Sequence, residues 1–475
     1  MKILIVGSGP SSYGALLKLA NFSNIEITMI DNSTEMDEFF DECIFEQNFD
    51  EGNRIPNNLN IYDKKIDDEL KNGPYASKIF GGFSNVWGGT VFPPSESEKK
   101  IYSDLGVDIE RFIGIIEENI QTFGNGLDAS NLVKTEFTKR ESFLYRKLKF
   151  NSNSNFDSYP AKICINSNNP HLSEGELLCK NCKNYLWSCR NDTIWSTKSY
   201  IKKAIQNGQI KYIPNGYLKE VKESDSVVKC NIVIDDHIQN LEFDKVFLGC
   251  GPINTSKIMM ESFDIDNLEI KTCDMVSLPY FTLKFGSPKN HSFADIFTYF
   301  KKEKVEFFLQ IYGFSKSLVT LASNVLPITK ILKYLPSSLF SNFGGIFLYV
   351  NQNYSTTLNI HKDENSKFNI YKKEITNPFP LNTFKELKTL LKKSGIFIIP
   401  FISKKFFYGK SNHYGSQFAH KNIKDEFSSD RLGRIFDLEN VHILDSSVLP
   451  VLNVGPLTVT IIANSYRIIE EIFDK

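Results

Sequence analysis

A glycine-rich turn near the N-terminus is the first segment whose residue types could do chemistry. Gly7-Ser8-Gly9-Pro10-Ser11-Ser12 follows the apolar run 2–6, and the small Ser12 stands where the third glycine of a dinucleotide-binding turn would be. Glycines let backbone N–H groups approach a pyrophosphate, and the following helix N-terminus adds partial positive charge. Asp31 ends the next β-branched run, where an acid would bind ribose hydroxyls. The pattern predicts a dinucleotide site but does not choose between NAD and FAD, and a glycine turn in an ordinary α/β protein is the alternative.

Three further segments resemble one family when taken in chain order with this turn. They are the glycine-rich loop 80–89, the segment 246–255 around Gly-Cys-Gly, and the C-terminal segment 441–450 followed by Gly455-Pro456. Together they are similar to the glucose-methanol-choline family of flavoprotein oxidoreductases, although Ser256 replaces a proline that the family usually has. The resemblance implies that the dinucleotide is FAD.

The same resemblance implies which residues contact the cofactor. Val86 precedes Trp87 where an attachment histidine would be expected, so the flavin is predicted to be non-covalent. The implied contacts are Gly7, Gly9, Ser12, Asp31, Gly82, Asn85, Trp87, Gly88, Gly251, Asp445 and Val448.

The catalytic candidate is His413. Residues 411–416 resemble the family's His-x-x-Gly-Thr, with Ser416 in place of the threonine. Alcohol oxidation needs a base for the hydroxyl proton while hydride leaves carbon for flavin N5, and a histidine with a pKa near neutrality suits that role. A structural histidine is the alternative. The family's second polar partner aligns with Gly455 here, so Asn453 is the candidate second catalytic residue.

Four cysteines could hold a metal. Cys179, Cys182 and Cys189 form Cys-x2-Cys-x6-Cys, and Cys164 lies upstream. Some bacterial relatives carry a ferredoxin-like motif in this region, and the sequence resembles it with Tyr185 in place of the third cysteine. Zinc, an iron–sulfur cluster and a degenerate site with free thiols all remain open.

Composition excludes several classes of function. Lys plus Arg (55) nearly balances Asp plus Glu (56), so there is no overall basic field to hold a nucleic acid. The apolar run before Gly7 is too short for a signal peptide, which predicts a cytoplasmic protein. Contact with a membrane surface through the apolar and lysine-rich stretches 318–335 and 385–410 is the less favoured interpretation.

The pattern of elements predicts an α/β fold, α+β overall, with a Rossmann-like FAD-binding domain. Residues 1–277 are expected to form this domain, with helical and cysteine-bearing insertions at about 99–192, and residues 426–475 to return to it. Alternating aromatic runs within 278–425 predict a substrate domain built on an antiparallel sheet with one wet face.

These observations predict an FAD-dependent oxidoreductase that oxidises a CH–OH group. The donor would be a sugar, a polyol or a glycan intermediate, because the sequence resembles a bacterial branch of this family associated with sugars and glycans. The sequence does not identify the electron acceptor. Two other functions remain: a flavin-binding scaffold that has lost catalysis, and an electron-transfer flavoprotein with a cysteine-bound metal centre.

Overall fold

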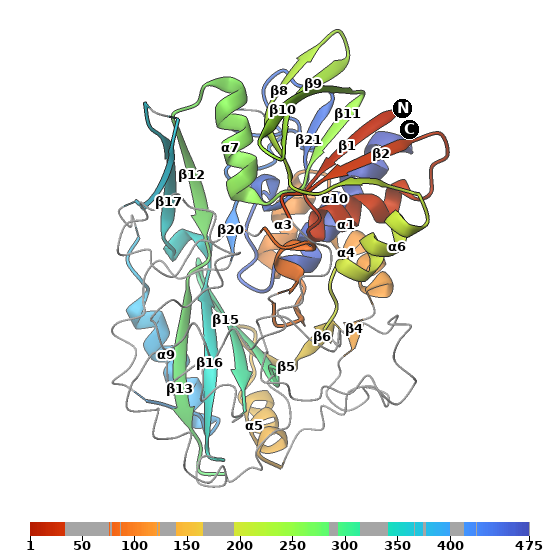
Figure 1. Ribbon diagram of the computed structural model, residues 1–475. Coiled ribbons are helices and arrows are strands. Elements are labelled where there is room, and N and C mark those ends of the chain that lie inside the picture. Colours follow the sequence, from red (N-terminus) through yellow and green to blue (C-terminus); the bar gives the residue numbers. More distant parts are fainter. Residues whose placement is uncertain are drawn as a thin grey trace.

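The fold is that of a computed structural model, shown in Figure 1. It describes residues 1–33, 76, 78–85, 87–120, 122–123, 139–164, 194–284, 293–313, 341–364, 366–373, 377–399, 413–423 and 425–474.

A parallel sheet of five strands carries the first domain. Its strand order is β21-β11-β1-β2-β7, so the chain begins at the centre of the sheet. Strands of this kind are covered on both faces, and the central runs are accordingly apolar and buried. The strands are β1 (Lys2–Val6), β2 (Glu26–Ile30), β7 (Lys211–Ile213), β11 (Lys245–Leu248) and β21 (Val441–Ile443).

Helices pack on this sheet and on one another. The C-terminal helix α10 crosses α1 so closely that a Cβ on Gly14 would overlap the Ile462 carbonyl oxygen. The antiparallel sheet β8-β9-β10 lies beside α7, and Ser262 Oγ of α7 accepts a hydrogen bond from Val221 N of β8 at 2.9 Å. These elements are α1 (Pro10–Leu19), α3 (Glu96–Asp104), α4 (Ile109–Asn119), α6 (Lys198–Gln206), α7 (Pro252–Phe263), α10 (Thr458–Phe473), β8 (Gly216–Ser224), β9 (Val227–Ile234) and β10 (His237–Phe243).

A six-stranded antiparallel sheet forms the second body of the molecule, seen below the parallel sheet in Figure 1. Its order is β19-β13-β16-β15-β14-β5. Residues of α5 and α9 join the apolar side chains of one face in a single buried cluster. The elements are β5 (Phe156–Pro160), β13 (Met275–Phe281), β14 (Ile296–Lys302), β15 (Val305–Tyr312), β16 (Phe343–Val350), β19 (Phe397–Ile398), α5 (Lys139–Phe150) and α9 (Leu381–Lys393).

The interior strand β15 lacks the wet face that the sequence predicts, whereas β13 alternates buried and more exposed residues as expected. Every residue of β15 is buried, on both faces. The reason is that the face opposite α5 and α9 packs toward the parallel-sheet domain and lines a cavity there. Gln310, a polar residue on that face of β15, therefore lines an internal surface.

Two small sheets connect the large ones, in the orders β18-β17-β12-β20 and β3-β6-β4. Their strands are β3 (Thr90–Val91), β4 (Thr122–Phe123), β6 (Lys162–Cys164), β12 (Asn267–Thr272), β17 (Thr357–Lys362), β18 (Phe368–Lys372) and β20 (Tyr414–Gly415). Short 3-10 turns are η3 (Gly82–Asn85), η6 (Gln352–Tyr354) and η8 (Ser446–Val448).

The chain has the α/β fold, α+β overall, that its sequence predicts. β5 pairs with β14 although it lies outside 278–425, so the six-stranded sheet also uses residues from the region expected to be an insertion. The domain boundaries themselves stay a prediction. No helix in the described part of the chain is long and apolar enough to cross a membrane.

Candidate functional site

In the turn between β1 and α1, Gly7 and Gly9 expose backbone atoms to a cavity because they carry no side chains. Gly7 has φ +94°, and a Cβ there would lie 2.8 Å from the Gly249 carbonyl oxygen, so the position requires glycine. Gly9 is the N-cap of α1, which has no side-chain cap and no acidic residue in its first turn. A Cβ on Gly9 would meet only the Gly249 oxygen, at 4.0 Å. The first N–H groups of α1 can therefore be approached by an anion.

Asp31 lies beside this turn, directly after β2. Ser8 Oγ donates to Asp31 Oδ2 at 2.6 Å, and Ser33 N donates to Asp31 Oδ1 at 2.9 Å. Gly81 N donates in turn to Ser8 Oγ at 2.7 Å, which ties the loop before η3 to the same turn. Burial raises the pKa of Asp31, and the hydrogen bonds from Ser8 and Ser33 oppose that rise. The carboxylate is held in place and still lines the cavity.

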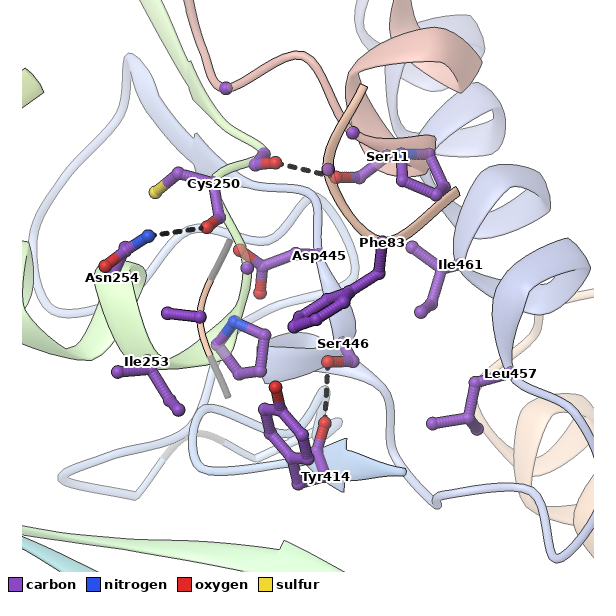
Figure 2. A pocket seen from close by; sticks show the side chains of 18 of the residues that line it. Ser11, Phe83, Cys250, Ile253, Asn254, Tyr414, Asp445, Ser446, Leu457 and Ile461 are labelled. Carbon is purple, nitrogen blue, oxygen red and sulfur yellow. Dashed lines mark hydrogen bonds between the residues drawn. The ribbon is translucent and has the colours of Figure 1, made fainter. Parts of the chain in front are cut away.

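A second turn, between β11 and α7, faces the first. Gly251 is the N-cap of α7 with φ +85°, and a Cβ there would meet nothing within 4 Å. Thr255 Oγ1 donates to Asp445 Oδ2 at 2.6 Å, and Ser447 N donates to Asp445 Oδ1 at 2.9 Å. Figure 2 shows the Asp445 carboxylate between the turn that carries Cys250 and the end of α1 that carries Ser11. We call residues 7–12 and 249–252, with Asp31 and Asp445, the glycine cradle.

A cavity of about 730 Å³ extends from the glycine cradle to the six-stranded sheet. Its volume is within the usual range for a site that holds a small molecule or cofactor. Most of the residues predicted from the sequence line it: Gly7, Gly9, Asp31, Gly82, Trp87, Gly88, Gly251, Asp445 and His413.

Four of the predicted site residues do not line the cavity. Ser12 is fully buried against Gly249, and a Cβ on Gly249 would overlap the Ser12 hydroxyl. The small Ser12 therefore allows α1 and the end of β11 to pack closely. Asn85 shapes the η3 loop, because its Nδ2 donates to the carbonyls of Phe80 and Gly82 at 2.9 and 2.8 Å.

The other two lie in the C-terminal segment. Val448 is fully buried, and its carbonyl accepts from His420 N at 2.9 Å. Asn453 is 1% exposed, and its Nδ2 donates to Thr460 Oγ1 of α10 at 2.8 Å. Asn453 is thus placed to hold the start of α10.

His413 lines the cavity and directly precedes β20. Its carbonyl accepts from Cys273 N at 2.9 Å, and the next residue, Tyr414, accepts from Ser446 Oγ at 2.8 Å. The imidazole is stacked on Tyr349 with ring centroids 4.7 Å apart and planes 9° apart. Burial lowers the pKa of His413 to about 4, so the ring is neutral at physiological pH and can accept a proton.

The surroundings of His413 are residues that the sequence interpretation missed. They alternate on one face of β13, β15 and β16, as the pairing of Gln310 with Phe347 and of Met275 with Tyr349 shows. We call this part of the cavity the aromatic end; it is lined by Met275, Gln310, Tyr312, Phe347, Tyr349 and His413. One signal was present in the sequence. The mostly apolar run 305–312 contains the polar residues Glu306 and Gln310, which the alternation of a strand places on one face.

The predicted metal site cannot be traced as a whole. Cys179, Cys182 and Cys189 lie outside the described residues. Cys164 is fully buried in β6, and burial raises the pKa of its thiol well above the usual value. Within the described ranges no group of three or more His, Cys, Asp or Glu residues could hold a metal ion.

The chain has a solved structural relative. No protein-family model matches the sequence, and no curated protein matches it either. Among solved structures, pyridoxine 4-oxidase from Mesorbium loti matches with a TM-score of 0.68 and 10% sequence identity, over 100% of this chain and 99% of that one. A likeness at this identity shows a shared fold, and it supports the glucose-methanol-choline fold that the motifs predict.

Proposed function

We propose that this protein is an oxidoreductase that binds FAD non-covalently and oxidises a CH–OH group of a small-molecule donor. The observation that carries the proposal is a single cavity that joins the glycine cradle to a neutral His413. The full-length fold likeness to pyridoxine 4-oxidase supports the same class of activity.

The residues of the glycine cradle fit such a cofactor. Open space over Gly9 and Gly251 lets backbone N–H groups reach a pyrophosphate without a side chain between them. Asp31 is placed to accept hydrogen bonds from ribose hydroxyls, and Asp445 lies nearby on the opposite turn. When bound, FAD supplies the acceptor for the hydride that leaves the donor carbon.

His413 would take the hydroxyl proton on an imidazole nitrogen. Its stacking on Tyr349 fixes the plane of the ring, and its depressed pKa keeps it neutral before the reaction. Removing that proton while the C–H electron pair leaves as hydride converts the alcohol into a carbonyl compound. Two electrons and one proton leave carbon together, and the second proton stays on His413.

The first experiment is to identify the cofactor. Purified protein should show flavin absorbance, and acid or heat should release FAD, since no covalent link is proposed. Release of NAD instead, or protein without any nucleotide after supplementation with FAD, would overturn the proposal.

The second experiment tests His413. His413→Ala protein should keep its FAD but be reduced about 10²- to 10⁴-fold more slowly by an alcohol donor under anaerobic conditions. The matched control is His237→Ala, which changes an exposed histidine of β10 and should leave the rate unchanged. If wild-type protein is reduced by dithionite but by no alcohol, the flavin-binding scaffold becomes the better explanation. If His413→Ala and wild type react equally fast, the base is another residue.

A further inference from the structure

A buried carboxyl group at the start of α3 reaches a segment that is distant in the sequence. Glu98 Oε1 accepts a hydrogen bond from Val454 N at 2.7 Å, across 356 residues of chain. Glu98 Oε2 accepts another from Ser95 N, also at 2.7 Å. Glu98 is 4% exposed and Val454 is 2% exposed. One side chain thus fixes two backbone N–H groups that belong to different parts of the chain.

Only the bond to Ser95 has a local explanation. Ser95 is the N-cap of α3, and it forms a capping box with Glu98, in which each side chain accepts from the other residue's backbone N–H. A capping box uses one oxygen of the glutamate. The second oxygen of Glu98 contributes nothing to the cap and instead holds Val454.

Val454 lies in the turn that leads into α10, and the residues after it form part of the cavity. Residues 456–458 line the cavity, and we call them the α10 wall. The same turn is held two residues earlier, where Leu452 N donates to Gln352 Oε1 at 3.0 Å. The position of the α10 wall therefore depends on the groups that bind the backbone of this turn, and Glu98 is one of them.

A second buried carboxyl group, that of Glu306 in β15, faces the same N-cap. Its Oε2 accepts from Ser95 Oγ at 3.0 Å. Burial and the nearby Glu306 raise the pKa of Glu98 to about 8, although the N–H groups of Ser95 and Val454 oppose the rise. In the described part of the chain, the titratable and charged groups around this junction are Tyr102 of α3, Cys273, Tyr299 and Lys301 of β14, Glu306 and Arg467 of α10.

The strength of the hold on Val454 depends on the proton of Glu98. A hydrogen bond that involves an ionised group is roughly twice as strong as one between neutral groups. As pH rises through 8, Glu98 loses its proton and its bonds to Ser95 N and Val454 N become stronger. A side chain that only filled space would not respond to pH in this way.

We propose that Glu98 is a positioning residue of the cavity, whose carboxyl group holds Val454 and thereby sets the place of the α10 wall. Glu98 does not itself line the cavity, so it acts through the backbone of the turn. Its part in catalysis rests on the proposed function. Its part in shaping the cavity goes beyond that function and can be tested without it.

Hydrogen exchange of the full-length protein, as purified, measures the hold directly. Glu98→Leu removes both acceptor oxygens, so the segment 451–457 should exchange faster than in the wild type, by about 2- to 10-fold at pH 7 and about 10- to 100-fold at pH 9. Comparing the two proteins at each pH cancels the intrinsic effect of pH on exchange. A ratio that stays constant from pH 7 to pH 9, whatever its size, overturns the assignment.

Two further variants separate this hold from a folding defect. Glu98→Gln keeps the size of the side chain and one acceptor oxygen but cannot ionise, so its exchange ratio to the wild type over 451–457 should also grow with pH. Asp108→Leu is the matched control, because Asp108 caps α4 by accepting from Arg111 N at 3.1 Å. That variant should leave 451–457 unchanged. An effect of Asp108→Leu as large as that of Glu98→Leu would show that losing any helix cap loosens the turn, and would overturn the assignment.

Flavin spectroscopy connects the α10 wall to the cofactor. In the flavin-loaded protein, visible circular dichroism should shift with a midpoint near pH 8, and the shift should be absent from Glu98→Gln. A growing exchange ratio without this shift in the wild type would place the effect outside the cavity and overturn the assignment.

The two measurements also separate this inference from the proposed function. A growing exchange ratio in a protein that binds no flavin overturns the proposed function and leaves Glu98 as the residue that positions the turn. Bound flavin together with a constant exchange ratio overturns the role of Glu98 and leaves the proposed function in place.

Discussion

The glycine cradle is built mainly from backbone groups, with the carboxylates of Asp31 and Asp445 beside them, whereas the aromatic end is built from side chains. In the cradle, glycines at Gly9 and Gly251 leave space, and two helix N-termini supply the polar contacts. At the aromatic end, rings, one amide and one thioether from β13, β15 and β16 form the surface together with His413. A backbone site recognises a feature that many nucleotides share, while a side-chain site can change with each strand position. The first end is therefore suited to a constant cofactor and the second to a particular substrate.

The largest expected effect comes from putting a side chain into the cradle. Gly9→Leu should abolish FAD binding, because the new side chain would occupy the space where the pyrophosphate meets α1. Flavin content after purification and after incubation with FAD measures this. Gly114→Leu is the matched control, since Gly114 is an exposed helical glycine with nothing within 4 Å, and that protein should keep its flavin.

Full flavin content in the Gly9→Leu protein would place the nucleotide elsewhere.

The next effect is on stability, and it tests whether the cradle depends on close helix packing. Gly14→Ala should destabilise the protein by up to about 2 kcal/mol. Overlap with the Ile462 carbonyl of α10 typically costs about 1–3 kcal/mol, and the helix propensity of alanine over glycine returns about 1 kcal/mol at most. Urea unfolding midpoints measure the difference.

Gly114→Ala in α4 gives the opposite sign and serves as the control. Its Cβ meets nothing within 4 Å, so only the propensity gain of about 0.5–1 kcal/mol remains. Stabilisation by Gly14→Ala as large as that by Gly114→Ala would mean that α1 and α10 are not in close contact.

The smallest effect concerns pH at the aromatic end. The pKa of His413 is lowered to about 4, so the ring stays neutral and the rate of flavin reduction should change less than about twofold from pH 6 to pH 9. The rate should fall only as pH approaches 4. A profile with its midpoint near 6.5 would indicate that water reaches the imidazole.

The lowered pKa of His413 also makes the stability of the folded protein decrease at acidic pH. Between pH 6.5 and 4 the unfolded chain binds a proton at His413 that the folded chain does not. The stability contributed by the neutral ring is complete above pH 6.5 and is lost as pH falls through 4. The unfolding midpoint of His413→Asn should consequently vary less over this window than that of the wild type.

Local sequence predicted the first half of the cradle as a strand, a glycine turn and a helix, with an acid after the next strand. Gly7 and Gly9 follow β1 and Asp31 follows β2. Asp445 was implied by the family resemblance, and its partner Thr255 comes from a distant segment. Ser12 was predicted to contact the cofactor, but it is buried against Gly249 and does not line the cavity.

The aromatic end shows the limit of local reasoning. Nothing near Gln310 in the sequence reveals that Tyr349 lies on the adjacent strand, or that His413 stacks on that ring. Asn453 was chosen for its distance along the chain from the Gly-Pro pair, yet its amide contacts Thr460 and does not line the cavity. The surroundings of His413 depend on strand pairing between distant segments, and the position of the Asn453 amide depends on how the turn before α10 folds.

The sequence by itself determined the class of fold and the turn that can bind an anion, because glycines, a helix start and an acid act through neighbouring backbone. Only the tertiary structure decided which side chains surround His413. The reason is geometric: alternation along a strand says that Gln310 and Tyr312 share a face, but the register with β16 and the packing of two domains decide what that face encloses.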